Sequence, residues 1–161
     1  MEPKLIHKEE MLITGIAVKT NNKREVSDSG DIPKLWSRFY TEKISHKIIQ
    51  SSSTEVLGVY TQYENKDEGD YLMLIGQQIS ETNRPNDDLV TVRLPASAYL
   101  VFSSKVGPVH QIVPETWKGI WKWFQEHDLE RAFAGDFELY DERSENPEKA
   151  VVDVYISIKQ A

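Results

Sequence analysis

The sequence predicts an α+β fold: a tandem strand–helix–strand–strand pseudo-dimer, with an antiparallel sheet and two helices on one face. Two observations predict it. The segments Ile32–Trp36 and Val113–Trp117 each begin with an apolar residue and a proline, and each carries a tryptophan three residues after the proline. Two apolar, strand-like runs follow each segment. This repeat indicates two similar halves related by a pseudo-two-fold axis.

An amphipathic helix is expected after each proline, because proline suits the first helical turn, where its missing N–H would have no partner. The large apolar residues that follow recur at the i, i+3, i+4, i+7 spacing of one helix face, or close to it. In the first half these are Trp36, Phe39, Tyr40 and Ile44, and in the second Trp117, Ile120, Trp121 and Phe124. The predicted helices are Pro33–Ile44 and Pro114–His127.

One strand is predicted before each helix and an antiparallel hairpin after it. The first-half strands are 12–19, 55–63 and 71–79, and the second-half strands are 98–104, 136–142 and 151–158. Polar segments 64–70 and 143–149 form the two hairpin loops. Residues 1–161 are therefore interpreted as one domain with repeats of about 1–80 and 89–161.

Composition excludes several functional classes. The 161 residues suit one domain, and the absence of cysteine excludes disulfides and thiolate sites. The four histidines lack metal-ligand spacing, so neither a metal nor a cofactor is expected. A net charge of −7 without a helix–turn–helix pattern argues against direct nucleic-acid binding. No apolar run has the length of a signal peptide or membrane span, so a cytoplasmic location is expected.

Glu138 is the main candidate for a ligand-binding residue. Because strand side chains alternate between faces, Glu138 and Tyr140 share one face of their strand, and Phe137 and Leu139 occupy the other. A carboxylate there either anchors a cation in an aromatic-lined cavity or lies on a solvated sheet face. Spacing alone leaves both interpretations open.

Aligning the two halves strengthens the first interpretation. Tyr60 and Tyr140 lie 27 and 26 residues after the two prolines, and the alignment places Gly58 opposite Glu138. One half would then supply a carboxylate where the other leaves space. The abundant tryptophan and tyrosine are compatible with a cavity wall and equally with an ordinary core.

The chain resembles the GyrI-like small-molecule-binding domain, also called the bacterial transcription-activator effector-binding domain. The resemblance covers the whole chain and is clearest in the second half, where the strand Phe137-Glu138-Leu139-Tyr140 is its most specific feature. Ser157 departs from the proline found in many relatives. The other matching segments are Leu94–Phe102, Gly107-Pro108, the helix with Trp117 and Trp121, and Val154–Ile158.

The resemblance implies the same tandem fold and the binding of varied lipophilic, often cationic small molecules. The family's buried glutamate corresponds to Glu138. The other ligand-binding residues expected from it are Tyr140, Tyr155, Trp36, Tyr40, Trp117 and Trp121, to which the repeat alignment adds Tyr60. No catalytic residue is nominated.

Two alternative functions stay open. Glu138, assisted by Tyr140, could act as a general acid or base in hydrolysis of a reactive small molecule. A protein-interaction role, such as protection of DNA gyrase through the acidic loops, is the other. The chain is expected to be either a stand-alone effector sensor or sequestering protein, or the sensing half of a two-protein regulator. A separate DNA-binding regulator and gyrase are its candidate protein partners.

Overall fold

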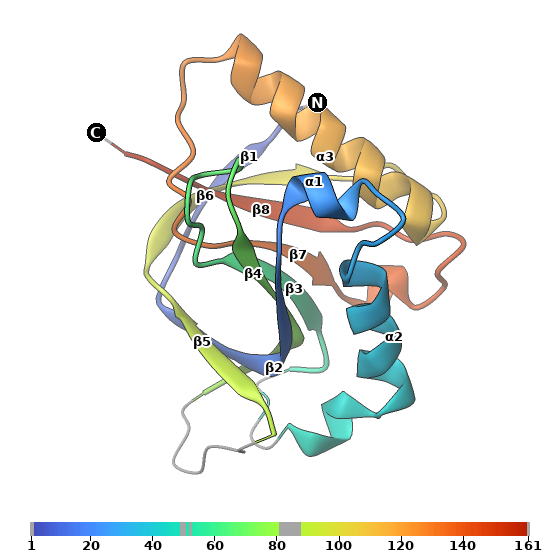
Figure 1. Ribbon diagram of the computed structural model, residues 1–161. Helices are drawn as coiled ribbons and strands as arrows, with labels where there is room; N and C mark the ends of the chain where they lie inside the picture. Colours follow the sequence, from blue (N-terminus) through green and yellow to red (C-terminus); the bar gives the residue numbers. More distant parts are fainter. Residues whose placement is uncertain (1, 49–50, 52, 81–87, 161) are drawn as a thin grey trace.

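The computed structural model describes residues 2–48, 51, 53–80 and 88–160. In this part of the chain, eight strands form one antiparallel sheet in the order β1-β6-β8-β7-β3-β4-β2-β5 (Figure 1). The strands are β1 (Lys4–Lys8), β2 (Met11–Thr20), β3 (Val56–Thr61), β4 (Tyr71–Ile79), β5 (Val90–Leu94), β6 (Ser97–Ser103), β7 (Asp136–Tyr140) and β8 (Asp153–Ile158).

The strand order confirms the predicted tandem fold. The second-half strands β6-β8-β7 are mirrored across the sheet centre by the first-half strands β2-β4-β3. At the centre β3 pairs with β7, and Gly58 lies directly opposite Glu138. On either side of it, Val56 pairs with Tyr140 and Tyr60 pairs with Asp136. The alignment of the halves makes Val56 equivalent to Asp136 and Tyr60 equivalent to Tyr140, so the two-fold operation turns one of these pairs into the other. The pseudo-two-fold axis therefore passes through the pair of Gly58 and Glu138.

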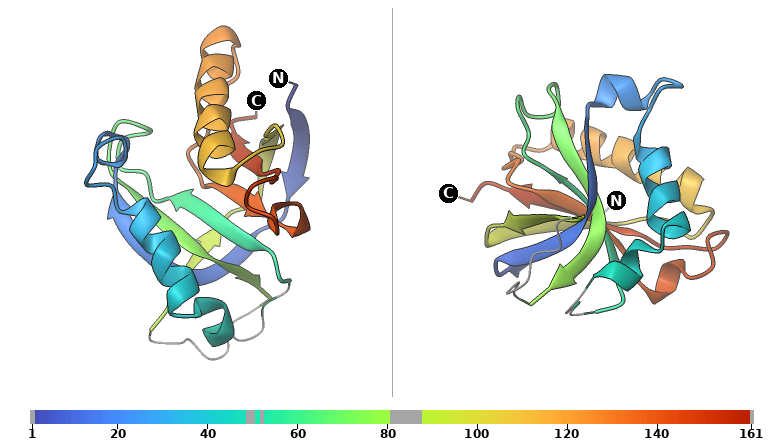
Figure 2. Two further views of the ribbon diagram at one scale, coloured as in Figure 1. Left: turned by 90° about the vertical axis from the view of Figure 1, so that its right-hand side faces the viewer. Right: turned by 60° about the horizontal axis from the view of Figure 1, so that its bottom comes forward.

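Two strands that the sequence did not predict explain the shape of the sheet. β1 and β2 are joined by residues 9–10, and β5 and β6 by residues 95–96, yet each joined pair is six positions apart in the sheet. In a flat sheet, six positions span about 29 Å, whereas two linking residues bridge at most about 11 Å. The sheet must therefore curl until its two edges approach, as Figure 2 shows.

The curled sheet buries apolar side chains on both faces. The concave face encloses a core that includes Leu57, Val59 and Phe137. The outer face carries both long helices, α2 (Ile32–Thr41) and α3 (Val109–Glu126) (Figure 2). Phe39 of α2 packs with β4, and Ile120 of α3 packs with β6 and β8. The expected placement of both helices on one face is thus confirmed. Among the described residues, none of the helices is apolar over a length that would cross a bilayer.

The predicted start of the second helix was wrong by one turn. α3 begins at Val109, because the carbonyl of Pro108 accepts the first helical bonds from Gln111 and Ile112. The additional turn is stabilised by Ile112, which is buried against the segment before β8. Pro114 therefore lies inside the helix, where its ring removes one backbone hydrogen bond.

The first helix ends three residues earlier than predicted. Lys43 adopts a left-handed conformation with φ of 50°, which stops the helix after Thr41. A short 3-10 helix, Ile44–Lys47, then buries Ile44 against the sheet. Two other short helices occur in the described residues, α1 (Asn22–Glu25) and a 3-10 turn at Glu142–Ser144.

Two facing glycines allow β2 and β4 to pass closely. Gly15 and Gly76 are direct partners, and a Cβ atom on Gly76 would lie 1.9 Å from the carbonyl oxygen of Thr14. We therefore expect Gly76→Ala to lower the free energy of unfolding by about 2–4 kcal/mol, because strands must separate. Urea denaturation measures this loss.

Gly107→Ala is the control for this substitution. A Cβ atom on Gly107 would meet only a methyl group of Ile112, at 3.0 Å, and a side chain can yield more easily than backbone. The account of close strand approach is wrong if both alanine variants lose the same amount of stability.

Candidate functional site

Glu138 is buried at the pseudo-two-fold axis and is bound by three aromatic side chains. Only 1% of the residue is exposed. Its Oε2 accepts hydrogen bonds from the Tyr60 hydroxyl and the Trp117 indole N–H, both at 2.7 Å. Its Oε1 accepts one from the Tyr140 hydroxyl at 2.5 Å. These donors come from β3, α3 and β7, so one carboxyl group joins both halves.

Burial raises the pKa of Glu138, because removal from water disfavours the charged form, and the three hydrogen bonds offset only part of that effect. Burial and the nearby Glu138 charge also raise the pKa values of Tyr60 and Tyr140 well above the usual range. Both phenols therefore stay protonated and act as donors. The carboxyl group fits because its neighbour is glycine: a Cβ atom on Gly58 would lie 3.3 Å from Glu138 Oε1.

The aromatic side chains around Glu138 follow the pseudo-symmetry. Trp36 meets Tyr140 edge-on at 4.8 Å between ring centroids, and Trp117 meets Tyr60 edge-on at 5.2 Å. One helical turn further along, Tyr40 lies beside Trp36 as Trp121 lies beside Trp117. The glutamate breaks this symmetry, because it accepts a hydrogen bond from the Trp117 indole, whereas the Trp36 indole gives it none.

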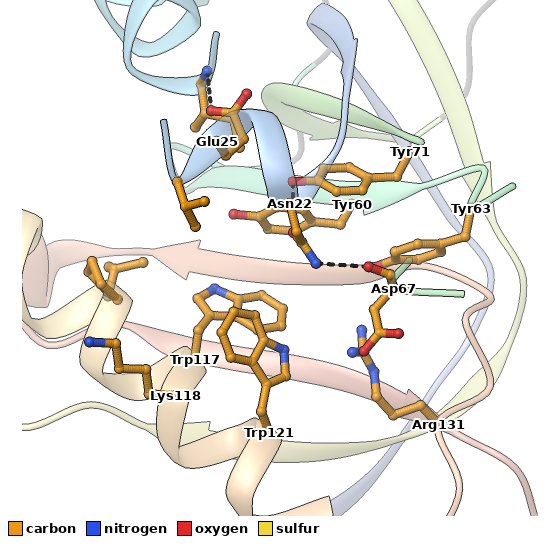
Figure 3. A pocket seen from close by; sticks show the side chains of 14 residues that line it. Asn22, Glu25, Tyr60, Tyr63, Asp67, Tyr71, Trp117, Lys118, Trp121 and Arg131 are labelled. Atoms are coloured by element: carbon orange, nitrogen blue, oxygen red, sulfur yellow. Dashed lines mark hydrogen bonds between the residues drawn. The ribbon is translucent and has the colours of Figure 1, made fainter. Parts of the chain in front are cut away.

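A pocket of about 280 Å³ opens on the Tyr60 and Trp117 side of the carboxyl group. The tyrosines Tyr60, Tyr63 and Tyr71 form one wall, and Trp117 and Trp121 form the facing wall (Figure 3). The other lining residues are Asn22, Glu25, Val26, Ile32, Asp67, Val113, Pro114, Lys118 and Arg131. A cavity with aromatic walls and few polar groups is typical of small-molecule sites.

Apart from Tyr155, the predicted site residues fall into two groups. Tyr60, Trp117 and Trp121 line the pocket, with Glu138 directly behind the first two. Tyr140 bonds Glu138 from the opposite side, where Trp36 and Tyr40 stack outward. Figure 3 shows that the tryptophan pair of α3 faces the tyrosines across the pocket.

Tyr155 is a correction, because the structure does not bring it to this site. Glu138 pairs with Val154, so alternation along β8 turns Tyr155 to the opposite, concave face. There Tyr155 stacks on Phe137 at 4.4 Å and lines a separate cavity of about 170 Å³. The resemblance did not indicate which face of β8 Tyr155 occupies.

Several pocket residues were missed by the sequence reasoning. Tyr71 could have been found, because strand alternation places it on the same face as Met73, whose β3 partner is Tyr60. Its ring lies 5.5 Å from that of Tyr60. Arg131 lies in the loop between α3 and β7, which has no periodic pattern that could have indicated it.

A second buried carboxyl group lies beside the first. Asp136 is fully buried, and its Oδ2 accepts hydrogen bonds from Tyr63 at 2.6 Å and from Arg131 at 2.7 Å. Its Oδ1 accepts from the backbone N–H and the hydroxyl of Ser157. Asp136 thus has a cationic partner, whereas Glu138 forms no ion pair with any described residue.

The raised pKa of Glu138 predicts a pH-dependent stability. The folded protein holds this proton more tightly than the unfolded chain, so the stabilisation is complete below the unfolded value of about 4.5 and is lost as pH rises through the folded pKa. Glu138→Gln has no proton to lose. We expect the free energy of unfolding of Glu138→Gln to rise relative to that of the wild type between pH 4 and pH 8.

Urea denaturation across this pH range measures how the free energy of unfolding of each protein changes with pH. The hydrogen bonds that Glu138→Gln loses lower its stability by the same amount at every pH, so they do not affect this comparison. Glu115→Gln, at an exposed position of α3, is the control and should follow the wild type. Parallel pH profiles for Glu138→Gln and wild type would contradict the assigned shift.

Comparison with known proteins agrees with the fold and assigns the chain to a family. The family model "GyrI-like small molecule binding domain" matches residues 1–159. A curated relative, the "Putative transcriptional regulator protein YobU" of Bacillus subtilis (strain 168), is 36% identical over 152 residues, which is 91% of each chain. An integron cassette protein of Vibrio cholerae superposes with a TM-score of 0.79 at 23% identity, over 98% of this chain and 95% of that one.

A second solved structure contains a ligand. SAV2435 bound to tetraphenylphosphonium superposes with a TM-score of 0.81 at 20% identity, over 99% of this chain and 94% of that one. At such identity the structural likeness concerns the fold alone, whereas the family match spans nearly the whole sequence. The chain belongs to the GyrI-like small-molecule-binding domain family.

Proposed function

We propose that this protein binds lipophilic, cationic small molecules in the pocket between β3, β4 and α3, with Glu138 as the charge anchor. One observation carries the proposal. A fully buried carboxyl group lies immediately behind an aromatic pocket and has only neutral hydrogen-bond donors as partners among the described residues. A cation in the pocket would supply the missing positive charge.

The ligand would act on Glu138 through the rings that bond it. Tyr60 and Trp117 line the pocket and also donate to the carboxylate, so they lie between ligand and charge. Donation to a carboxylate polarises each ring, and a polarised ring face attracts a cation more strongly. At an effective dielectric constant of about 20, unit charges roughly 7 Å apart also attract by about 2.4 kcal/mol.

The rest of the pocket favours the lipophilic part of such a ligand. Val26, Ile32 and Val113 lie among the aromatic walls, and apolar contact contributes about 25 cal/mol per Å² removed from water. The tetraphenylphosphonium bound by SAV2435 is a lipophilic cation, which supports this choice by analogy.

A role as an effector sensor is the biological setting we propose. It is supported by the family and by the relative named as a transcriptional regulator. Binding would be transmitted to a separate DNA-binding regulator. The same chemistry would serve a protein that sequesters toxic cations.

Substitution of Glu138 tests the charge anchor. We expect Glu138→Gln to weaken binding of methyltriphenylphosphonium at least about tenfold, because the charge attraction is lost. Binding of the uncharged isostere 1,1,1-triphenylethane should change less than about twofold. Quenching of the pocket tryptophans measures both affinities, and an equal loss for both compounds would rule out the anchor role.

The pseudo-symmetry supplies a matched pair of variants that tests the location of the site. Trp121 and Tyr40 occupy equivalent helix positions, and only Trp121 lines the pocket. We expect Trp121→Ala to weaken methyltriphenylphosphonium about tenfold and Tyr40→Ala to leave its affinity unchanged. Calorimetry measures both. The opposite pattern would place the ligand on the Trp36 side of Glu138.

A further inference from the structure

Arg131 has more hydrogen-bond donors than the protein satisfies. Only 8% of its side chain is exposed. A guanidinium group has five N–H donors, but among the described residues Arg131 forms one hydrogen bond, from Nη2 to Asp136. Its Nε is buried without any partner. Buried donors without acceptors cost free energy, so this side chain requires a further partner.

The position of Arg131 is fixed before any ligand arrives. Asp136 holds Nη2 at 2.7 Å and is itself held by Tyr63 and Ser157. The guanidinium lies 4.3 Å from the ring centroid of Phe133 and 6.0 Å from that of Trp117. Aromatic rings therefore occupy its neighbourhood without offering an acceptor. Arg131 nevertheless lines the pocket and flanks the tryptophan pair on the side away from Lys118 (Figure 3).

We propose that Arg131 binds a neutral hydrogen-bond acceptor of the ligand, such as a ketone, amide or ester carbonyl. This inference rests on the proposed function and narrows it: the preferred ligand is a lipophilic cation that also carries a carbonyl group. The cationic centre lies toward Glu138, and the carbonyl oxygen accepts from the spare N–H groups of Arg131.

The charges around the pocket favour a neutral acceptor over a carboxylate. Asp136 already neutralises Arg131. Among the described residues, four carboxyl groups and two cationic side chains lie in or directly behind the pocket: Glu25, Asp67, Asp136 and Glu138 against Lys118 and Arg131. An anionic ligand group would meet excess negative charge, whereas a carbonyl accepts a hydrogen bond without adding charge.

The test uses two phosphonium cations that differ in one group. Methyl(4-acetylphenyl)diphenylphosphonium carries a carbonyl where methyl(4-isopropylphenyl)diphenylphosphonium carries an apolar group of similar shape. For the wild type we expect the acetyl compound to bind at least about tenfold more tightly, as for a hydrogen bond to a charged, buried donor. Affinities equal within twofold would overturn the Arg131 proposal and leave the cation site intact.

Variants then assign the preference to Arg131. The double substitution Arg131→Met with Asp136→Asn removes the donor without leaving an unpaired buried charge. We expect it to abolish the acetyl preference, so that the two phosphonium compounds bind this variant with equal affinity. A retained preference in a folded variant would overturn the assignment.

NMR of the wild type gives an answer even if the variant does not fold. The Arg131 Nε–H resonance should shift downfield with the acetyl compound and not with the isopropyl compound. Equal responses to both compounds would overturn the proposal.

A neutral ligand pair separates this proposal from the charge anchor. The matching 1,1,1-triphenylethanes carry the same acetyl or isopropyl group and no charge. If neither phosphonium binds, the cation proposal fails. An acetyl preference in the neutral pair would then still support acceptor binding by Arg131, and its absence would overturn that too.

Discussion

The buried carboxyl group of Glu138 is the interaction on which the centre of this molecule depends. Its three donors come from a strand of the first half, a strand of the second half and the helix over the second half. The group therefore holds the helix layer in register with the middle of the sheet. Because burial opposes its charge, the same contact leaves an electrostatic imbalance beside the pocket. In the proposed function, this one group would serve both the fold and ligand recognition.

The site combines a symmetric frame with one asymmetric substitution. Each half contributes a tryptophan and a tyrosine, and each tryptophan contacts the tyrosine of the other half edge-on at a similar distance. At the axis, the two equivalent positions are Gly58 and Glu138, and the glycine provides the space that the carboxyl group fills. A symmetric pair of glutamates there would place two buried charges together, which is strongly unfavourable. One acid on a two-fold axis avoids that repulsion and gives the two sides different properties.

The sequence predicted the parts that depend on local periodicity and repetition. Alignment of the halves anticipated that Gly58 and Glu138 are equivalent positions, which the structure brings together as a direct strand pair, and helical spacing anticipated the tryptophan faces. The sequence-based predictions failed where contacts between residues far apart in the chain determine the structure. β1 and β5 pair with the opposite half, Tyr155 took the face set by its strand register, and burial of Ile112 extended α3 ahead of Pro114. Arg131 left no signal in the sequence, because its contact with Asp136 arises only where the loop before β7 folds back onto that strand.

The two short links between distant strands determine what in this molecule can move. Residues 9–10 and 95–96 each tie one edge of the sheet to the other, so the halves cannot hinge apart without breaking strand pairs. In the proposed function, ligands of different shape would be accommodated by rotation of the pocket rings and by small shifts of α1 and α3, while the sheet keeps its shape. The range of ligands that such a protein could bind would then depend on the mobility of the pocket side chains, because the sheet itself does not change shape.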